Sequence, residues 1–184
     1  MSLAAVGDYV QSLLQGLTWP PAMSGLQPLE CYIKPPDPNV QSGIPAAYIW
    51  QKSGRESRDT DKLRSGTVPR ISFPGGPSGT KAVDYQIPIF LVWEMDTADP
   101  DNENLFPGMM WNIMAALRGT TYAAGAQNSV TPVKLTDPWT GEQSWLIDLG
   151  EDLSFDSDFR ALEPQRALRW DGVIDCSVSE VIAA

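Results

Sequence analysis

The chain has 184 residues, of which 13 are lysine or arginine, 23 are aspartate or glutamate and none is histidine, so its net charge at pH 7 is -10. Because histidine is the usual acid-base residue near neutral pH and a common metal ligand, this composition argues against Ser-His-Asp and Cys-His catalysis and against His-ligated metal sites. The length fits a single domain spanning 1–184, and the acidic balance argues against nucleic-acid binding.

The two cysteines, Cys31 and Cys176, form no CxxC motif. Two buried free thiols are the expected state, although a disulfide is compatible with the sequence. The N-terminal segment has no basic region typical of a signal peptide, and no apolar run approaches the roughly 20 residues of a membrane helix. We therefore expect a soluble protein without an export signal or membrane contact.

The first half of the chain predicts one helix, two strands and a long loop. Apolar residues repeat with helical spacing over residues 3–17, and strand-like segments follow at 29–34 and 46–52. Residues 53–80 are rich in charge, glycine, serine and proline and have no sustained apolar period. Loops of this length are usually functional or disordered, so we expect a mobile basic loop there that awaits a partner.

The strongest strand signal lies at residues 81–94, where apolar residues alternate with polar ones. Pro88 has no amide donor, which predicts either a sheet edge or a bulge at that point. Residues 105–117 predict a second helix with its apolar face at Phe106, Met109, Met110, Ile113 and Leu117.

The last third of the chain predicts strands joined by turns. Segments 133–136 and 144–149 flank a hairpin turn at 137–142, and residues 168–182 alternate as a long strand with one wet face. This order of elements predicts an α+β fold: a largely antiparallel sheet with two helices packed on one side and a long extended loop or hairpin.

An acidic stretch and the tryptophans are candidates for a site. The densest acidic stretch, around Gly150, is interpreted as a solvated face because nothing aims two of its carboxylates at one point. Its residues are Asp148, Glu151, Asp152, Asp156 and Asp158. Most of the seven tryptophans are expected to pack in the interior, whereas Trp139 lies at a turn tip and is the candidate for binding a partner.

The charge of the long loop is the most informative feature. From Lys52 through Lys81, counting both ends, the chain has seven basic and three acidic side chains, a local charge of +4, so the rest of the chain carries -14. Such polarity suits a basic arm that docks on an acidic neighbour, including another copy of the chain. The candidate interface residues are therefore Arg55, Arg58, Lys62, Arg64, Arg70 and Trp139. No catalytic residue, cofactor or metal is expected.

The chain resembles the tail terminator, or tail completion, proteins of long-tailed siphophages, especially those of actinobacterial hosts. The resemblance covers most of the chain as an order of elements and is carried by four segments in combination. These are DYQIPIFLVWEMD, IMAALRG, TDPWTGEQSWLIDLGEDLSF and the terminal VSEVIAA.

The resemblance implies a structural virion protein and no enzyme. Six copies would close into a ring that caps the tail tube, stops its polymerisation and offers a surface to the head-tail connector or stopper protein. The implied partners are the protein itself, the major tail tube protein and the connector. DNA would pass through the lumen without specific binding, and the protein would be assembled in the host cytoplasm and reside in the virion tail.

Three alternatives remain open. Another neck or tail-tube protein of the virion would share the small α+β build, and a carboxylate- or metal-dependent hydrolase would use the acidic stretch near Gly150. A small acidic inhibitor, binding a basic partner as a monomer, is a third class.

Overall fold

A computed structural model describes residues 3–36, 44–50, 53–57, 80–96, 105–118, 133–162 and 167–183. Its helices are α1 (Leu3–Gln15), the short 3-10 helix η1 (Pro21–Met23) and α3 (Leu105–Arg118). Its strands are β1 (Glu30–Tyr32), β2 (Ala46–Ile49), β3 (Ser53–Ser57), β4 (Thr80–Gln86), β5 (Ile89–Asp96), β6 (Val133–Thr136), β7 (Gln143–Leu162) and β8 (Ala167–Ala183). The α+β fold with a largely antiparallel sheet is confirmed.

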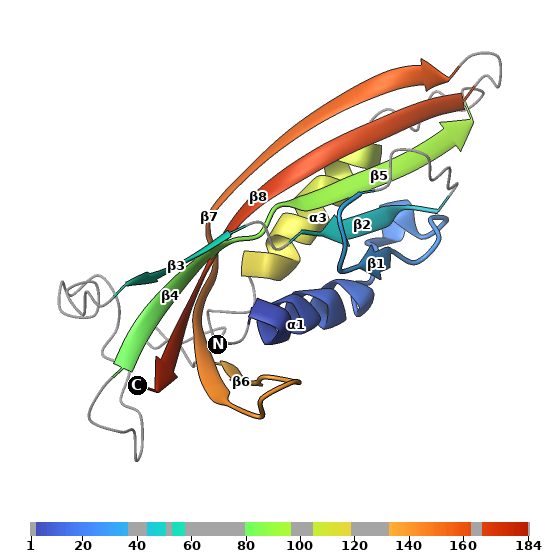
Figure 1. Ribbon diagram of the computed structural model, residues 1–184. Helices are drawn as coiled ribbons and strands as arrows, with labels where there is room; N and C mark the ends of the chain where they lie inside the picture. Colours follow the sequence, from blue (N-terminus) through green and yellow to red (C-terminus); the bar gives the residue numbers. More distant parts are fainter. Residues whose placement is uncertain are drawn as a thin grey trace.

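Strand β8 is the centre of the sheet. It pairs antiparallel with β7 on one side, and on the other side with β5 along its first half and β4 along its second half. β3 extends the sheet from β4, β2 and β1 extend it from β5, and β6 pairs with the start of β7. All of these pairs are antiparallel except β1 with β2, which run parallel. The long β7 and β8 strands form the arched spine of the molecule (Figure 1).

The strand predicted at 81–94 is interrupted at Pro88 and forms β4 and β5. Ile87 still donates its backbone N–H to the Cys176 carbonyl at 2.9 Å, and the Pro88 carbonyl accepts from the Trp50 N–H at 3.1 Å. The strand is not at an edge, because β8 lies on one side of both halves while β3 pairs with β4 and β2 pairs with β5 on the other side. Of the two expectations for Pro88, the local irregularity is therefore correct and the edge position is wrong.

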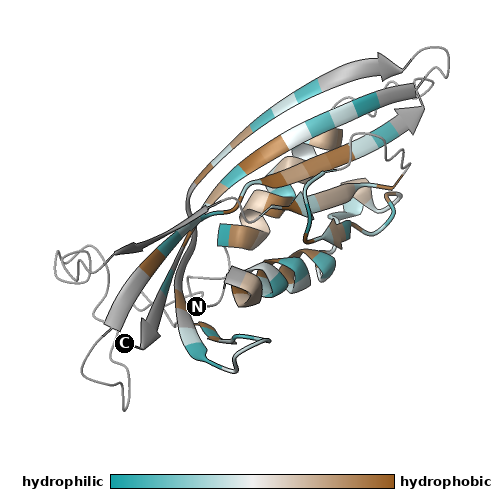
Figure 2. Ribbon diagram, in the orientation of Figure 1, coloured by the Kyte–Doolittle hydropathy of each residue, from teal (hydrophilic) through white to brown (hydrophobic). Residues whose placement is uncertain are grey.

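Both described α-helices cover one face of the sheet, as predicted (Figure 1). Their apolar stripes join inward residues of β2, β4, β5 and β8 in one large core, to which α3 contributes the whole predicted face. In Figure 2, hydrophobic residues gather in the middle of β5 and β8 beside the helices, whereas the second half of β7 is more hydrophilic. Burial of this shared face accounts for the position of the helices.

Helix α3 approaches β8 closely at Gly172. A Cβ atom at this position would lie 2.8 Å from Met110 Sδ and 3.0 Å from Phe106 Cε1, so glycine leaves room for the helix. Beside it, Phe106 stacks on Trp170 with ring centroids 5.4 Å apart. These contacts anchor the helix on the first half of β8.

Two boundaries expected from the sequence are wrong. Residues 53–57 were assigned to the loop, but they form β3, whose backbone bonds to β4 require no apolar face at the edge of the sheet. The strand expected at 144–149 continues to Leu162 through register shifts, so the acidic stretch lies within β7. Gly150 and the aspartates weaken the strand signal, but β7 pairs with β8 on both sides of the register shifts, and this pairing extends the strand.

The second half of β8 buries a carboxylate on the helix side of the sheet. Glu180 is fully buried and accepts hydrogen bonds from Tyr85 Oη at 2.9 Å and Ser144 Oγ at 3.3 Å. Burial, together with the nearby Glu180 charge, raises the pKa of Tyr85 above its usual value of 10.0. The tyrosine therefore stays protonated and remains a donor for the carboxylate.

We expect Tyr85→Phe to lower the free energy of unfolding by about 1–3 kcal/mol at pH 7, because the buried carboxylate loses a donor. The folded chain keeps the Tyr85 proton to a higher pH than the unfolded chain, so this contribution is lost as pH rises above about 10. Urea denaturation of both proteins from pH 7 to 11 measures the difference. A gap that stays constant over this range would contradict the assignment.

The expected buried free thiols are confirmed. Cys31 and Cys176 form no disulfide and are buried in the main core. Burial raises the pKa of the Cys31 thiol to about 12, so its reactive thiolate form is disfavoured at neutral pH.

Candidate functional site

The sheet face opposite the helices, here called the open face, carries the candidate site. Alternation along β5 places Ile89, Leu91 and Trp93 in the helix-side core and leaves Phe90 and Val92 on the open face. Cross-strand neighbours share a face, so the register extends this surface from β2 through β8 to β7. Both described α-helices lie on the other side (Figure 1).

A groove of about 440 Å³ lies on the open face between the segment after β1 and strand β7. Its floor is apolar and includes Phe90, Val92 and Val173, and Pro36 lines it from the β1 side. Asp156, Ser157 and Asp158 of β7 and Arg169, Asp171, Gly172 of β8 complete the lining with Leu91. The groove therefore combines a hydrophobic floor with a charged wall.

Register explains why the aspartates gather there. Asp158 is directly opposite Asp171, and Asp156 is opposite Val173, so these side chains occupy the same face of two paired strands. Asp156 and Asp158 are exposed, and Asp156 Oδ1 accepts the backbone N–H of Ser157 at 2.9 Å. Three aspartates and one arginine line the groove, which gives it an excess of negative charge.

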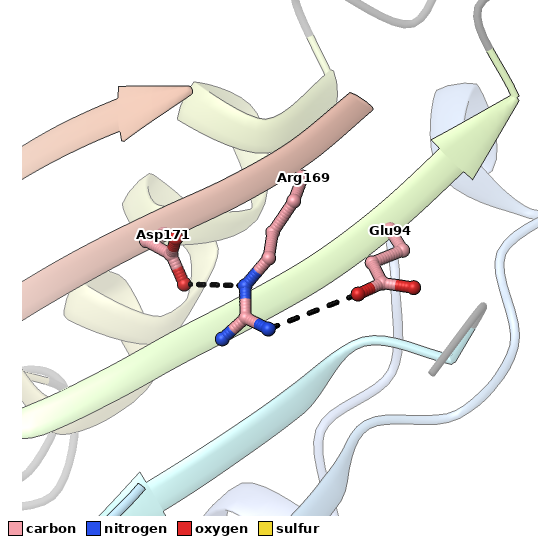
Figure 3. A network of polar contacts seen from close by, with 3 residues as sticks. All are labelled: Glu94, Arg169 and Asp171. Atoms are coloured by element: carbon pink, nitrogen blue, oxygen red, sulfur yellow. Dashed lines mark hydrogen bonds and ion pairs between the residues drawn. The ribbon is translucent and has the colours of Figure 1, made fainter. Parts of the chain in front are cut away.

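Arg169, which lines the groove, contacts the carboxylates of Asp171 and Glu94 (Figure 3). It is only 4% exposed, its Nε donates to Asp171 Oδ1 at 3.0 Å, and its Nη1 lies 3.8 Å from Glu94 Oε1. Glu94 faces Arg169 directly across the β5–β8 pair. Within the described part of the chain, Glu94 Oε1 accepts no hydrogen bond. The Arg169 guanidinium is the cation with which this oxygen forms an ion pair.

Aromatic residues occupy the open face on the β1 and β2 side. Tyr32 and Tyr48 stack with centroids 5.4 Å apart, and Lys34 Nζ lies 4.8 Å from the Tyr32 ring. The Trp50 and Phe90 rings are 6.0 Å apart. A hydrogen bond from Tyr32 Oη to Glu30 Oε2 at 2.6 Å, with its carboxylate charge, raises the pKa of Tyr32. The apolar floor of the groove thus continues into an aromatic surface.

Trp139 lies at the tip of the β6–β7 hairpin and is 85% exposed, as expected for a turn. Asp137 builds the turn, because its Oδ1 accepts the N–H groups of Trp139 and Thr140, both at 2.8 Å. Gly141 has φ of 71°, a conformation that favours glycine at this step. The predicted turn and the exposure of Trp139 are confirmed, whereas no partner of Trp139 is tested.

The other tryptophans only partly follow the expectation of interior packing. Trp93 is buried, but Trp50 and Trp111 are exposed at 38% and 58%. Trp111 lies on the outer face of α3, where the Arg118 guanidinium is 5.3 Å from its ring. That a tryptophan lies within a helix or strand did not predict whether its side chain faces the core or solvent.

The basic candidate residues are not brought together by the described structure. Arg55 occupies β3 opposite Asp84, at the end of the sheet farthest from the groove along β8. Arg58, Lys62, Arg64 and Arg70 lie outside the described residues. Their assignment to an interface stays a prediction.

The acidic stretch is spread along β7 rather than gathered at one point. Asp156 and Asp158 are exposed, which agrees with a solvated face for those two residues. Within the described ranges, no three acidic or cysteine side chains are grouped so as to hold a metal ion. No α-helix of the described part has both the length and the apolar character needed to cross a membrane.

Comparison with known proteins adds no relative. The chain matches no protein-family model, and a comparison with curated proteins also gives no match.

Sequence reasoning missed the groove and its ion pairs. The pattern at 168–182 places Arg169 and Asp171 on the polar face of a strand, and the pattern at 81–94 places Glu94 at a polar position. The i, i+2 spacing of Arg169 and Asp171 signals a shared face. The register that brings Glu94 opposite Arg169 is a tertiary feature and has no local signal.

Proposed function

We propose that this protein is a structural subunit that assembles into a ring capping a phage tail tube. The observation that carries the proposal is the open face, which bears an apolar groove with an acidic wall while the helices close the other face. The order of elements, similar to that of tail terminator proteins, supplies the biological setting. The ring would end tube polymerisation and offer a joining surface to the head-tail connector in the virion.

The groove chemistry favours a protein neighbour. Its floor of Phe90, Val92 and Val173 adjoins the Tyr32–Tyr48 stack, so apolar and aromatic surface is continuous and bordered by charge. A hydrophobic centre with a polar rim is typical of protein–protein interfaces. The sequence contains no histidine. The described residues that line the groove include no cysteine and no lysine beside the aspartates.

The charge distribution favours a head-to-tail contact. The acidic groove lies beside the first half of β8, whereas β4 pairs with the second half and carries β3 on its other side. The basic residues after Ser57 follow β3 in the sequence. Two different complementary patches on one subunit produce a heterologous interface, which closes into a ring if the rotation between copies permits. A twofold dimer would instead pair one patch with itself.

Negative-stain electron microscopy of the purified protein, alone and mixed with tail tubes, tests the proposal. We expect discrete short rings or caps at tube ends, and tubes that stop elongating when the protein is added. Long polymers of the protein itself would indicate the alternative of a tail-tube protein. A monomer that neither forms rings nor binds tube ends would overturn the proposal.

A second expectation concerns DNA. With a net charge of -10, the assembled protein should repel the phosphate backbone, so DNA would pass the lumen without being retained. We expect no gel shift of short duplex DNA at low salt, where electrostatic binding is strongest. A clear, salt-sensitive shift would contradict an acidic, non-binding lumen.

A further inference from the structure

We propose that the open-face groove of one copy binds the basic segment, residues 62–73, of a neighbouring copy. The proposal rests on the proposed ring and specifies the contact that would join its subunits. It starts from the chemistry of the groove, which needs an occupant with both apolar and cationic side chains. Phe90, Val92 and Val173 supply the apolar floor, and Asp156 and Asp158 the exposed acidic wall.

The basic segment has this composition. Its sequence is KLRSGTVPRISF, with Lys62, Arg64 and Arg70 and no acidic residue, interspersed with Leu63, Val68, Ile71 and Phe73. Arg169, the basic residue that lines the groove in the described structure, is already bonded to Asp171 and ion-paired with Glu94. The three aspartates that line the groove outnumber its one arginine, so a basic segment complements the groove in charge, and complementary charge favours specific, rapid association.

Chain length favours a second copy over the segment's own groove. Strand β3 ends at Ser57 and β4 begins at Thr80. Ser57 is level with Val181 of β8 across β4, and Thr80 pairs with Ala183. The groove borders Val173, about ten residues from Ala183, or roughly 33 Å at 3.3 Å per residue. Arg70, ten residues before Thr80, would need a fully extended chain of about 35 Å to span this distance.

Arg64 is still more restricted. It follows Ser57 by seven residues, which span at most about 25 Å when fully extended. From Val181, opposite the Ser57 pair, the β8 strand runs about 26 Å to Val173 before the groove is reached. Arg64 and Arg70 would thus need a fully extended chain to approach the groove of their own copy. The groove of a neighbouring copy can lie closer to them.

Disulfide trapping tests the contact in the full-length protein. One chain carries Val173→Cys in the groove floor and a second, larger tagged chain carries Ser65→Cys in the basic segment. Mild oxidation of the mixture should give a covalent heterodimer, and a chain carrying both changes should give a ladder of linked copies. The native cysteines are buried, so the wild-type protein serves as the background control.

Charge reversal tests the chemistry. Asp156→Lys with Asp158→Lys should reduce the crosslink yield on the order of tenfold, and adding Arg64→Asp with Arg70→Asp should restore it. Asp8→Lys is the control, since Asp8 is exposed on α1, on the helix side of the sheet. The inference is overturned if the double-cysteine chain closes only on itself, if the yield equals that of an Asp8→Cys and Ser65→Cys mixture, or if the groove reversal has no effect.

Imaging separates this inference from the proposed function. Rings that form normally on tubes while trapping fails would overturn the groove contact and leave the ring function standing. Efficient trapping in a protein that never caps tubes would support the contact and overturn the terminator function.

Discussion

Phe106→Ala is expected to lower the free energy of unfolding by about 3–5 kcal/mol, the largest effect of any single change considered for this protein. Phe106 is fully buried, stacks on Trp170 and contacts the space above Gly172, where α3 comes closest to β8. Alanine would leave a cavity between helix and sheet that neither rigid element can close. Urea denaturation followed by far-UV circular dichroism measures the change.

Trp111→Ala is the matched control for the same helix. Trp111 is a larger aromatic residue five positions further on, but it lies on the exposed face and contacts Arg118. Its removal should cost less than about 1 kcal/mol. If both variants lose similar stability, the orientation of α3 on the sheet is wrong.

Arg169→Met is expected to lower the free energy of unfolding by about 3 kcal/mol, because it leaves the largely buried Glu94 carboxylate without its cation. Asp171 loses a hydrogen bond as well, but it is partly solvated and contributes less. The Arg169→Met, Glu94→Gln double variant should recover part of the loss, since the buried charge is then removed. A double-mutant cycle by urea denaturation measures this coupling.

Lys34→Met is the control that measures the cost of losing an exposed cation rather than a buried one. Lys34 is exposed and interacts with the Tyr32 ring at 4.8 Å, so its loss should cost less than about 1 kcal/mol. An Arg169→Met cost no larger than that of Lys34→Met, or a cycle without coupling, would show that the Glu94–Arg169–Asp171 network does not stabilise the β5–β8 register.

The expected elements were most accurate where the apolar pattern was strong. Both helices were located within one or two residues, and the buried face of α3 was predicted except for Met114, because an amphipathic stripe must be buried wherever the helix packs. The strands were predicted where apolar residues alternate, but β3 and the second half of β7 were missed. Polar edge strands depend on backbone hydrogen bonds to a neighbour, which composition does not reveal.

The candidate site was predicted less well than the fold. Trp139 was correctly expected at an exposed turn, because the Asp-Pro and Thr-Gly steps are local signals. The groove was not predicted, because its lining comes from segments far apart in the chain. Asp158 and Asp171 become neighbours only through the β7–β8 register, and Glu94 and Arg169 only through the β5–β8 register.

The sequence by itself determined the α+β class, the absence of histidine chemistry and the contrast between a +4 segment and a -14 remainder. These properties depend on composition and local periodicity, which do not change with the arrangement of the elements. The tertiary structure decided that β8 is central, that the open face carries an apolar groove with an acidic wall, and that this groove and β3 lie toward opposite ends of the sheet. The reason is physical: strand register converts distant residues into neighbours, and only neighbours create a binding surface.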